Sequence, residues 1–222
     1  MLGALDTYAL RDFVPVTPEV WARLFERLNG QVWPWQGLFL LLMLFALWRL
    51  HRGGSATAGL ALAACWCWSA VQFQFLLHAP LNWAASLMGW AFMVQAVLVF
   101  LVGLGGGWRF SGGLRAKLGV VLVLAGIVVL PVTGPLTGRS WAAFEVAGTA
   151  PTPTALVTLG MLLLARPIGW VTGVIPVLWL VYSSVIWWVS GWLPGAVVAP
   201  LAIGTLGVAM GAGPWSRGRE PS

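Results

Sequence analysis

The sequence GRSWAAFEVAGTAPTPT, residues Gly138–Thr154, lies between apolar runs in a chain that is nearly all apolar helix by its sequence pattern. Pro151 and Pro153 oppose a regular helix through it, because proline lacks the backbone N–H that a helix interior needs. The apolar run that follows, residues 155–165, covers roughly 17 Å at about 1.5 Å per residue, against a hydrocarbon core about 30 Å thick. Either this segment therefore enters the membrane, or the helix after it is a half-helix.

Composition predicts a polytopic membrane protein. Of the 222 residues, 59% are hydrophobic and only 8% are charged, whereas a soluble domain carries about 25% charged residues. Repeated long apolar runs with short polar stretches between them are typical of a bundle of transmembrane helices. The net charge of +6 does not indicate nucleic acid, because the basic residues form no cluster. The expected partner is the lipid bilayer, and either a small solute or a partner membrane protein stays open.

Residues 1–32 form the most extended polar region, which we expect to face outward and to contain an amphipathic helix. Thr17 is a typical N-cap residue, Pro18 suits the first helical position, and Glu19 favours the positive end of the helix dipole. The residues that follow place one apolar stripe along the helix: Val20, Trp21, Leu24, Phe25 and Leu28. The helix is therefore predicted to lie on the membrane surface or to cover the bundle.

The remaining sequence predicts an all-α bundle of seven spans over residues 33–215, followed by a cytoplasmic tail at 216–222. The expected spans are residues 33–50, 56–77, 83–104, 118–136, the short run 155–165, 168–189 and 194–212. A six-span alternative, in which the short run fails to cross, would bring both termini to the same side.

Loop charges predict the orientation of the bundle. The loops at 49–55, 105–117 and 166, together with the tail, hold eight Arg or Lys and one acid, Glu220. The positive-inside rule places these loops in the cytoplasm, so the N-terminus lies outside and the C-terminus inside, as seven spans require. Tryptophans near the predicted outer and inner ends are expected to anchor the interfaces: Trp33, Trp83, Trp141, Trp188 and Trp192, and Trp48, Trp108, Trp170 and Trp215.

Arg139 and Glu145 are the foremost candidate site residues. If their segment enters the membrane, both charges lose water and need partners, most simply each other. Thr152 or Thr154 is then placed to cap the following half-helix, whose N-terminal amides would face the same space. The alternative is an exposed loop with a weak surface ion pair.

A second set of polar residues is predicted to line the outer half of a cavity. Gln74 and His78 share a helix face, and Asn82 begins the next span at a similar depth. Gln95 lies nearer to the middle of the membrane. The alternative is that these side chains only make structural hydrogen bonds between helices.

Sequence motifs of catalysis are missing. The chain has no HExxH, no GxSxG, no phosphate-binding loop and no cysteine cluster, so we predict no catalytic, cofactor-binding or metal-binding residue. Cys65 and Cys67 lie on different sides of one helix and are interpreted as small buried residues.

Several blocks together resemble an uncharacterised family of small bacterial multi-pass membrane proteins, a domain of unknown function sometimes labelled permease. The blocks are Tyr8–Phe13, Glu19–Asn29, Trp33–Pro34, Asn82–Ala85, Trp90–Phe92, and Gly138–Trp141 with Glu145, Pro151–Thr154 and Thr158–Gly160. The resemblance implies a bacterial inner membrane and brings no activity. In the pattern an Asp often stands between the two prolines, and here Thr152 replaces that anionic ligand.

The sequence supports two functional hypotheses of different classes. The first is a permease-like or channel-like protein with an outward-facing polar pocket formed by the eight candidate residues. The second is an accessory or structural membrane subunit without transport of its own. A membrane enzyme is a third reading, which lacks a motif.

Overall fold

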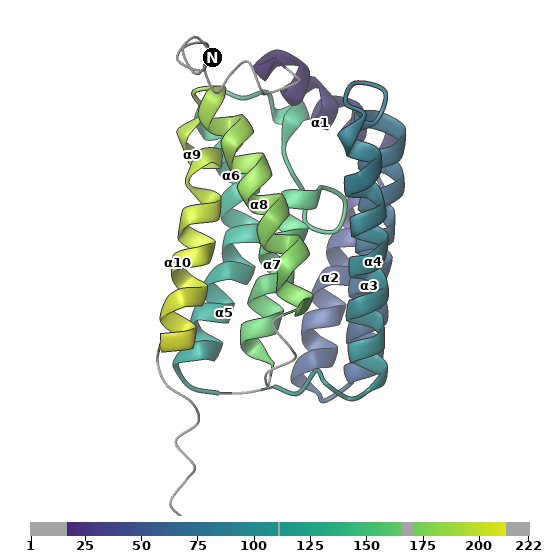
Figure 1. Ribbon diagram of the computed structural model, residues 1–222, viewed down its shortest axis with the longest axis vertical. Helices are drawn as coiled ribbons and strands as arrows, with labels where there is room; N and C mark the ends of the chain where they lie inside the picture. Colours follow the sequence, from purple (N-terminus) through teal and green to yellow (C-terminus); the bar gives the residue numbers. More distant parts are fainter. Residues whose placement is uncertain (1–16, 111, 166–170, 212–222) are drawn as a thin grey trace, which may run out of the picture.

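The computed structural model describes residues 17–110, 112–165 and 171–211, and these residues form an all-α bundle of long helices that run side by side (Figure 1). The all-α class is confirmed for this part of the chain. Residues 1–16 of the predicted outward segment, the predicted tail 216–222, Trp170 and Trp215 lie outside the described residues.

Within the described ranges, five helical stretches are long and apolar enough to cross a membrane. They are Ser55–His78, α4 at Ala84–Leu104, Leu114–Leu136, α8 at Val171–Val189, and Leu193–Met210. The first joins α3, Ser55–Trp68, to a π-helical segment, Ser69–His78. The third joins α5, Leu114–Leu124, through Ala125–Val129 to α6, Leu130–Leu136. The last contains α9, Leu193–Ala196, and all but the final residue of α10, Val198–Gly211. A polytopic bundle is therefore supported by length and composition.

Two further segments decide whether the crossings number seven. Helices α1, Pro18–Val32, and α2, Gln36–His51, meet at a bend of 92°, and counted as one span they would raise the number of candidates to six. Helix α7, Pro151–Leu164, is apolar but too short for the same criterion. Seven crossings require α2 and α7 to count separately, and that number stays a prediction.

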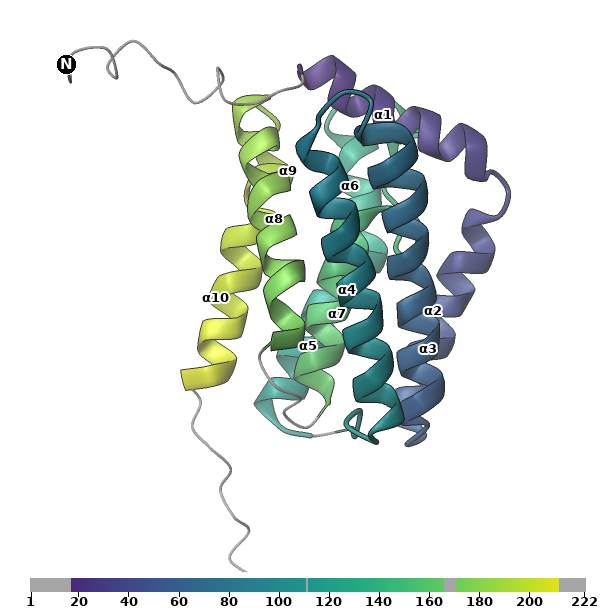
Figure 2. The same ribbon diagram turned by 45° about the vertical axis from the view of Figure 1, so that its right-hand side comes forward.

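Helix α1 lies across one end of the bundle, roughly at right angles to the long helices (Figure 2). It begins as expected: the Thr17 hydroxyl accepts a hydrogen bond from the Val20 N–H, and Pro18 occupies the first turn. Four residues of the predicted stripe are buried, namely Trp21, Leu24, Phe25 and Leu28. The apolar stripe of α1 therefore packs against the bundle, and the helix covers that end of the bundle.

Helix α7 lies in the middle of the bundle, and all of its residues except Leu162 are buried. Close packing against α5 depends on glycine, because a Cβ on Gly160 would lie 2.7 Å from the Gly119 carbonyl oxygen. Pro151 begins α7, so the prolines start this helix, where the expectation had placed them in irregular chain before it. Proline is tolerated there because the first helical N–H groups have no partner within the helix.

The two ends of the bundle differ in charge. The α2–α3 and α4–α5 connections lie at the end opposite α1 (Figure 1). These connections and the adjoining helix ends carry five basic residues: Arg49, Arg52, Arg109, Arg115 and Lys117. Of the tryptophans expected at interfaces, Trp33, Trp83, Trp141 and Trp188 are at least 65% exposed. The expectation was wrong for Trp108, which is fully buried and donates its Nε1–H to the Val99 carbonyl.

Candidate functional site

The chain between α6 and α7 turns back into the bundle. It leaves the end that α1 covers, descends part of the way along the helices, and continues into α7 (Figure 1). Residues 145–150 are all buried. In the turn before α7, Gly148 has a positive φ of 93°, and a Cβ there would lie 3.0 Å from the Phe39 carbonyl oxygen of α2, so both the conformation and the space favour glycine. We call residues 137–150 the re-entrant loop.

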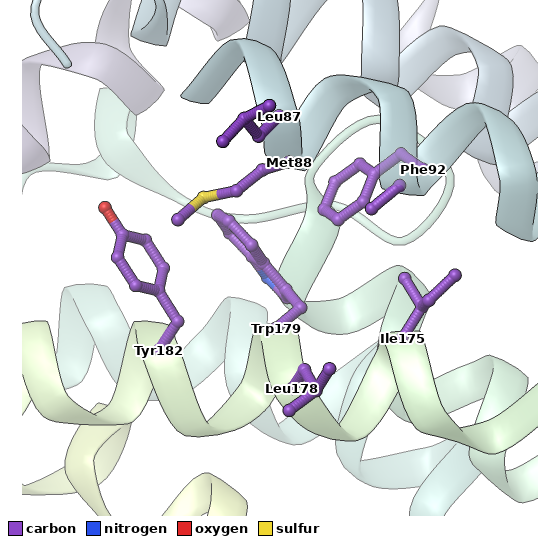
Figure 3. A pocket seen from close by; sticks show the side chains of 8 residues that line it. Leu87, Met88, Phe92, Ile175, Leu178, Trp179 and Tyr182 are labelled. Atoms are coloured by element: carbon purple, nitrogen blue, oxygen red, sulfur yellow. The ribbon is translucent and has the colours of Figure 1, made fainter. Parts of the chain in front are cut away.

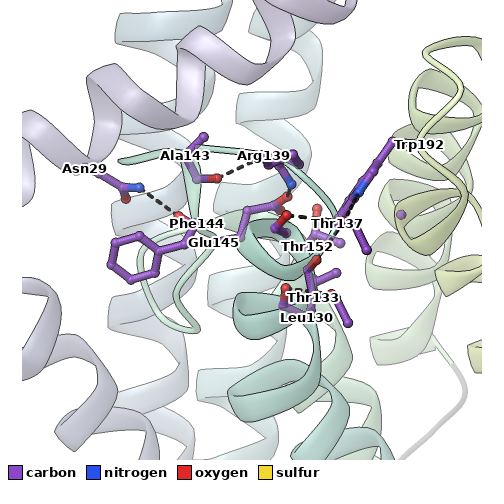
Figure 4. Close-up of polar contacts among 12 residues, drawn as sticks. Asn29, Leu130, Thr133, Thr137, Arg139, Ala143, Phe144, Glu145, Thr152 and Trp192 are labelled. Carbon is purple, nitrogen blue, oxygen red and sulfur yellow. Dashed lines mark hydrogen bonds and ion pairs between the residues drawn. The ribbon is translucent and has the colours of Figure 1, made fainter. Parts of the chain in front are cut away.

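Arg139 and Glu145 form an ion pair within this loop (Figure 4). Arg139 Nη1 lies 3.3 Å from Glu145 Oε1, and Nη2 donates to the Ala143 carbonyl at 2.9 Å. The Glu145 side chain is 1% exposed and that of Arg139 is 11% exposed. Arg139 Nε and Glu145 Oε2 are buried without a hydrogen bond of ordinary geometry. The charges therefore partner each other, while Arg139 Nε has no hydrogen-bond partner among the described residues.

An aromatic cage surrounds the guanidinium group of Arg139. Its Cζ atom lies 4.3 Å from the ring centre of Trp187, 4.5 Å from that of Trp192 and 5.7 Å from that of Phe25. The negative faces of aromatic rings attract a cation, most strongly where water is excluded. The cage thus offsets part of the cost of burying the charge and ties the loop to α1 and α8.

Asn29 of α1 binds the loop by hydrogen bonds. Its Nδ2 donates to the carbonyls of Ala142 and Phe144 at 2.6 and 2.7 Å, and its Oδ1 accepts from Gln36 Nε2 at 2.6 Å (Figure 4). Sequence reasoning did not identify Asn29. A polar residue four positions after Phe25, on the buried stripe of α1, was the available signal.

Thr152 and Thr154 lie in the first turn of α7, but neither is its N-cap, which is Ala150. The expected capping role is therefore wrong. Thr152 accepts a hydrogen bond from Trp179 Nε1 at 3.2 Å and interacts with the Glu145 carboxyl group. Thr154 accepts from the Gly148 N–H at 2.8 Å and donates to the Ala150 carbonyl at 2.6 Å. Thr152 thus contacts the charged pair, while Thr154 holds the turn at Gly148.

Gln74, His78 and Asn82 form a second cluster, completed by Tyr182 of α8. His78 Nδ1 lies 3.0 Å from Gln74 Oε1, and Asn82 Nδ2 donates to the Tyr182 hydroxyl at 3.2 Å. Gln74 and His78 are fully buried and Asn82 is nearly so. The ring of Trp21 connects this cluster to the cage, because its centre lies 5.4 Å from that of His78 and 6.3 Å from that of Trp187.

Gln95 stands apart from both groups, and its Nε2 donates to the Thr172 carbonyl at 2.9 Å. The eight candidate residues therefore divide into separate hydrogen-bonded groups. None of them lines any of three surface pockets, which lie between α4 and α8 (Figure 3), on α1, and between α8 and α10. Among the residues that the structure describes, no three His, Cys, Asp or Glu side chains lie together as metal ligands would.

Long apolar helices, a broken segment inside the bundle and charged side chains shielded by the protein define a polytopic helical membrane protein. The sequence profile of a family of unknown function, DUF6064, matches residues 18–189, which is more than half of the chain. The chain belongs to this family. No curated protein and no solved structure matches it.

Proposed function

We propose that this protein is a permease-like or channel-like membrane protein whose solute path passes the re-entrant loop. The observation that supports this function is the burial of Arg139 and Glu145 where irregular chain meets a half-helix. Charged residues inside a membrane domain are costly and usually mark a solute or ion path. Discontinuous helices form the substrate sites of many transporters.

In this proposal the described conformation is closed. Helix α1 covers the loop through Asn29, and Phe25 packs beside the Arg139 guanidinium. Separation of α1 from the loop would open an outward-facing polar pocket at Glu145 and Thr152.

The proposed setting is a bacterial inner membrane with seven crossings, the N-terminus outside and the C-terminus in the cytoplasm. Helix α1 and the end of α10 lie at opposite ends of the bundle, which agrees with an odd number of crossings (Figure 1). The basic connections opposite α1 agree with a cytoplasmic location of that end.

A second candidate function is an accessory subunit without transport. One observation favours it: the pockets described between α4 and α8, on α1, and between α8 and α10 do not reach the buried charged pair. A protein that never opens would have the same closed interior.

Cysteine accessibility distinguishes the two functions without knowledge of the solute. In a background without the native cysteines, Thr152→Cys is exposed to a membrane-impermeant thiol reagent in sealed vesicles of each orientation. A permeation pathway predicts slow labelling from the α1 side only, because Thr152 is 1% exposed in the closed form. Leu159→Cys, also on α7 and fully buried, is the control that stays unlabelled.

Two exposed controls, Arg23→Cys on α1 and Arg109→Cys between α4 and α5, should label rapidly from opposite sides. Labelling of both from one side would reject the proposed orientation. If Thr152→Cys is as unreactive as Leu159→Cys in both vesicle orientations, permeation is rejected and the accessory function stands.

A further inference from the structure

The surroundings of the Arg139 guanidinium have the composition of a cation-binding site (Figure 4). The rings of Trp187 and Trp192 meet at 69° with their centres 4.6 Å apart, so they form two adjoining walls. The guanidinium Cζ lies 4.3 and 4.5 Å from these two ring centres, and Nη1 lies 3.3 Å from Glu145 Oε1. Aromatic faces and a desolvated carboxylate both attract a cation and repel an anion. The site therefore favours positive charge.

The two tryptophan walls are held by contacts other than the guanidinium. Trp192 Nε1 donates to the Thr137 hydroxyl at 2.7 Å, where the re-entrant loop begins. Trp187 belongs to α8, is 3% exposed and packs edge to face on Trp192. Of the three rings around Arg139, the ring of Phe25 alone lies on α1. Separation of α1 from the loop would therefore remove one wall and leave the other two in place.

Arg139 itself makes few polar contacts in the site. A guanidinium group has five N–H donors. Among the described residues, Nη1 donates to Glu145 and Nη2 to the Ala143 carbonyl, while Nε has no hydrogen-bond partner. The Arg139 side chain is also the more exposed member of the ion pair, at 11% against 1% for Glu145. A compact organic cation in its place would give up few hydrogen bonds and would keep the rings and the carboxylate.

We propose that this site binds a monovalent organic cation of the methylated ammonium or alkylguanidinium class, and that Arg139 occupies the site in the closed form. The inference rests on the proposed permeation function and names its solute class. When α1 and Phe25 separate from the loop, the Arg139 side chain moves outward and the solute takes its place beside Glu145. A metal ion is a poorer occupant, since no three acidic, His or Cys side chains lie together in the described part of the chain.

Thermal unfolding of an Arg139→Ala variant in mild detergent tests the chemistry of the site, because this variant empties the cage and keeps Glu145. Tetramethylammonium chloride, at about five times its dissociation constant, should raise the midpoint by about 2 to 4 °C. Sodium chloride and sodium acetate at the same concentration should not. The control combines Arg139→Ala with Glu145→Gln, which keeps the rings without the negative charge and should respond less. Equal rises in both variants, or a rise with acetate, would overturn the proposal.

Uptake by the unmodified protein is the second measurement, and it decides the question if Arg139→Ala does not elute as a folded protein. Proteoliposomes with an inside-negative potassium diffusion potential should accumulate radiolabelled tetramethylammonium. Trp192→Leu should raise the half-saturating concentration about twofold to thirtyfold, as the loss of one cation–π contact predicts. Trp83→Leu is the matched control, because Trp83 is 81% exposed and lies outside the cage, so its uptake should be unchanged. Equal half-saturation in the two tryptophan variants would contradict the proposed site.

Failure of this inference can be distinguished from failure of the permeation function. If Thr152→Cys labels from the α1 side but the unmodified protein takes up neither tetramethylammonium nor methylguanidinium, permeation stands and the organic-cation class is rejected. If Thr152→Cys is unreactive from both sides, permeation is rejected, and the inference is rejected with it.

Discussion

At the scale of single residues, the cost of burying Arg139 and Glu145 is offset by contacts from several parts of the chain. Their ion pair at 3.3 Å is joined by the Ala143 carbonyl and by the rings of Trp187 and Trp192. A buried ion pair often adds little net stability, because desolvation opposes the attraction. Removal of one partner is nevertheless costly, since the other charge is left buried and alone.

A double-mutant cycle tests this balance. Glu145→Gln and Arg139→Gln should each lower the free energy of unfolding by about 3 kcal/mol or more, as expected for a broken buried pair. The double variant should lose less than the sum, because neither charge is then left unpaired. Denaturation in mild detergent measures the free energy of unfolding of the unmodified protein, the two single variants and the double variant. Single losses below about 1 kcal/mol that add without coupling would indicate an exposed pair instead.

The sequence predicted the partners in this pair but not their surroundings. Arg139 and Glu145 are close in the chain, and opposite charges in a segment between apolar runs indicate a pair. Phe25, Trp187 and Trp192 come from distant elements, and tryptophans near helix ends are equally typical of interface anchors. Periodicity carries no information about which distant rings will meet.

At the scale of secondary structure, α7 depends on close approach to α5. Gly160 and Gly119 lie against each other's carbonyl groups. A Cβ added to either glycine would be 2.7 Å from the carbonyl oxygen of the other. Such contacts allow two backbones to pack closely in a membrane domain, where no hydrophobic effect holds helices together. The glycines thus fix the depth and position of the helix that begins at the loop.

Gly160→Ala should destabilise the protein although alanine is the better helix former, because the new methyl group meets backbone on α5. We expect a loss of about 1 to 3 kcal/mol, seen as a lower midpoint of thermal unfolding. Gly204→Ala on α10 is the matched control, since a Cβ there meets nothing within 4 Å, and it should be neutral or stabilising. Equal midpoints for the two variants would show that the α5–α7 contact is not close-packed.

The elements themselves were largely predictable. The long apolar runs and the capped amphipathic helix at Thr17 follow from composition, periodicity and capping chemistry, which act locally. The start of α7 was placed too late, because the two prolines were interpreted as preventing a helix when they occupy its first turn.

At the scale of the whole molecule, the re-entrant loop and α1 close one end of the bundle together. Asn29 binds the loop, and Trp21 lies between the His78 cluster and the Arg139 cage. The sequence suggested one polar pocket because Gln74, His78, Asn82 and the loop residues were all expected in the outer half of the membrane, with Gln95 nearer to its middle. Depth does not determine which side of a helix faces which neighbour, so the separation into groups was not predictable.

Amide hydrogen exchange in lipid nanodiscs tests most directly whether the loop lies inside the bundle. The amides of residues 145–150 should exchange as slowly as those of α7, because these residues are buried and the N–H groups of Gly148, Thr149 and Ala150 are hydrogen-bonded. The connection at residues 105–110, which is mostly exposed or half-buried, should exchange faster. Exchange of 145–150 as fast as that of 105–110 would contradict the account, since the loop would then lie in water with its charges.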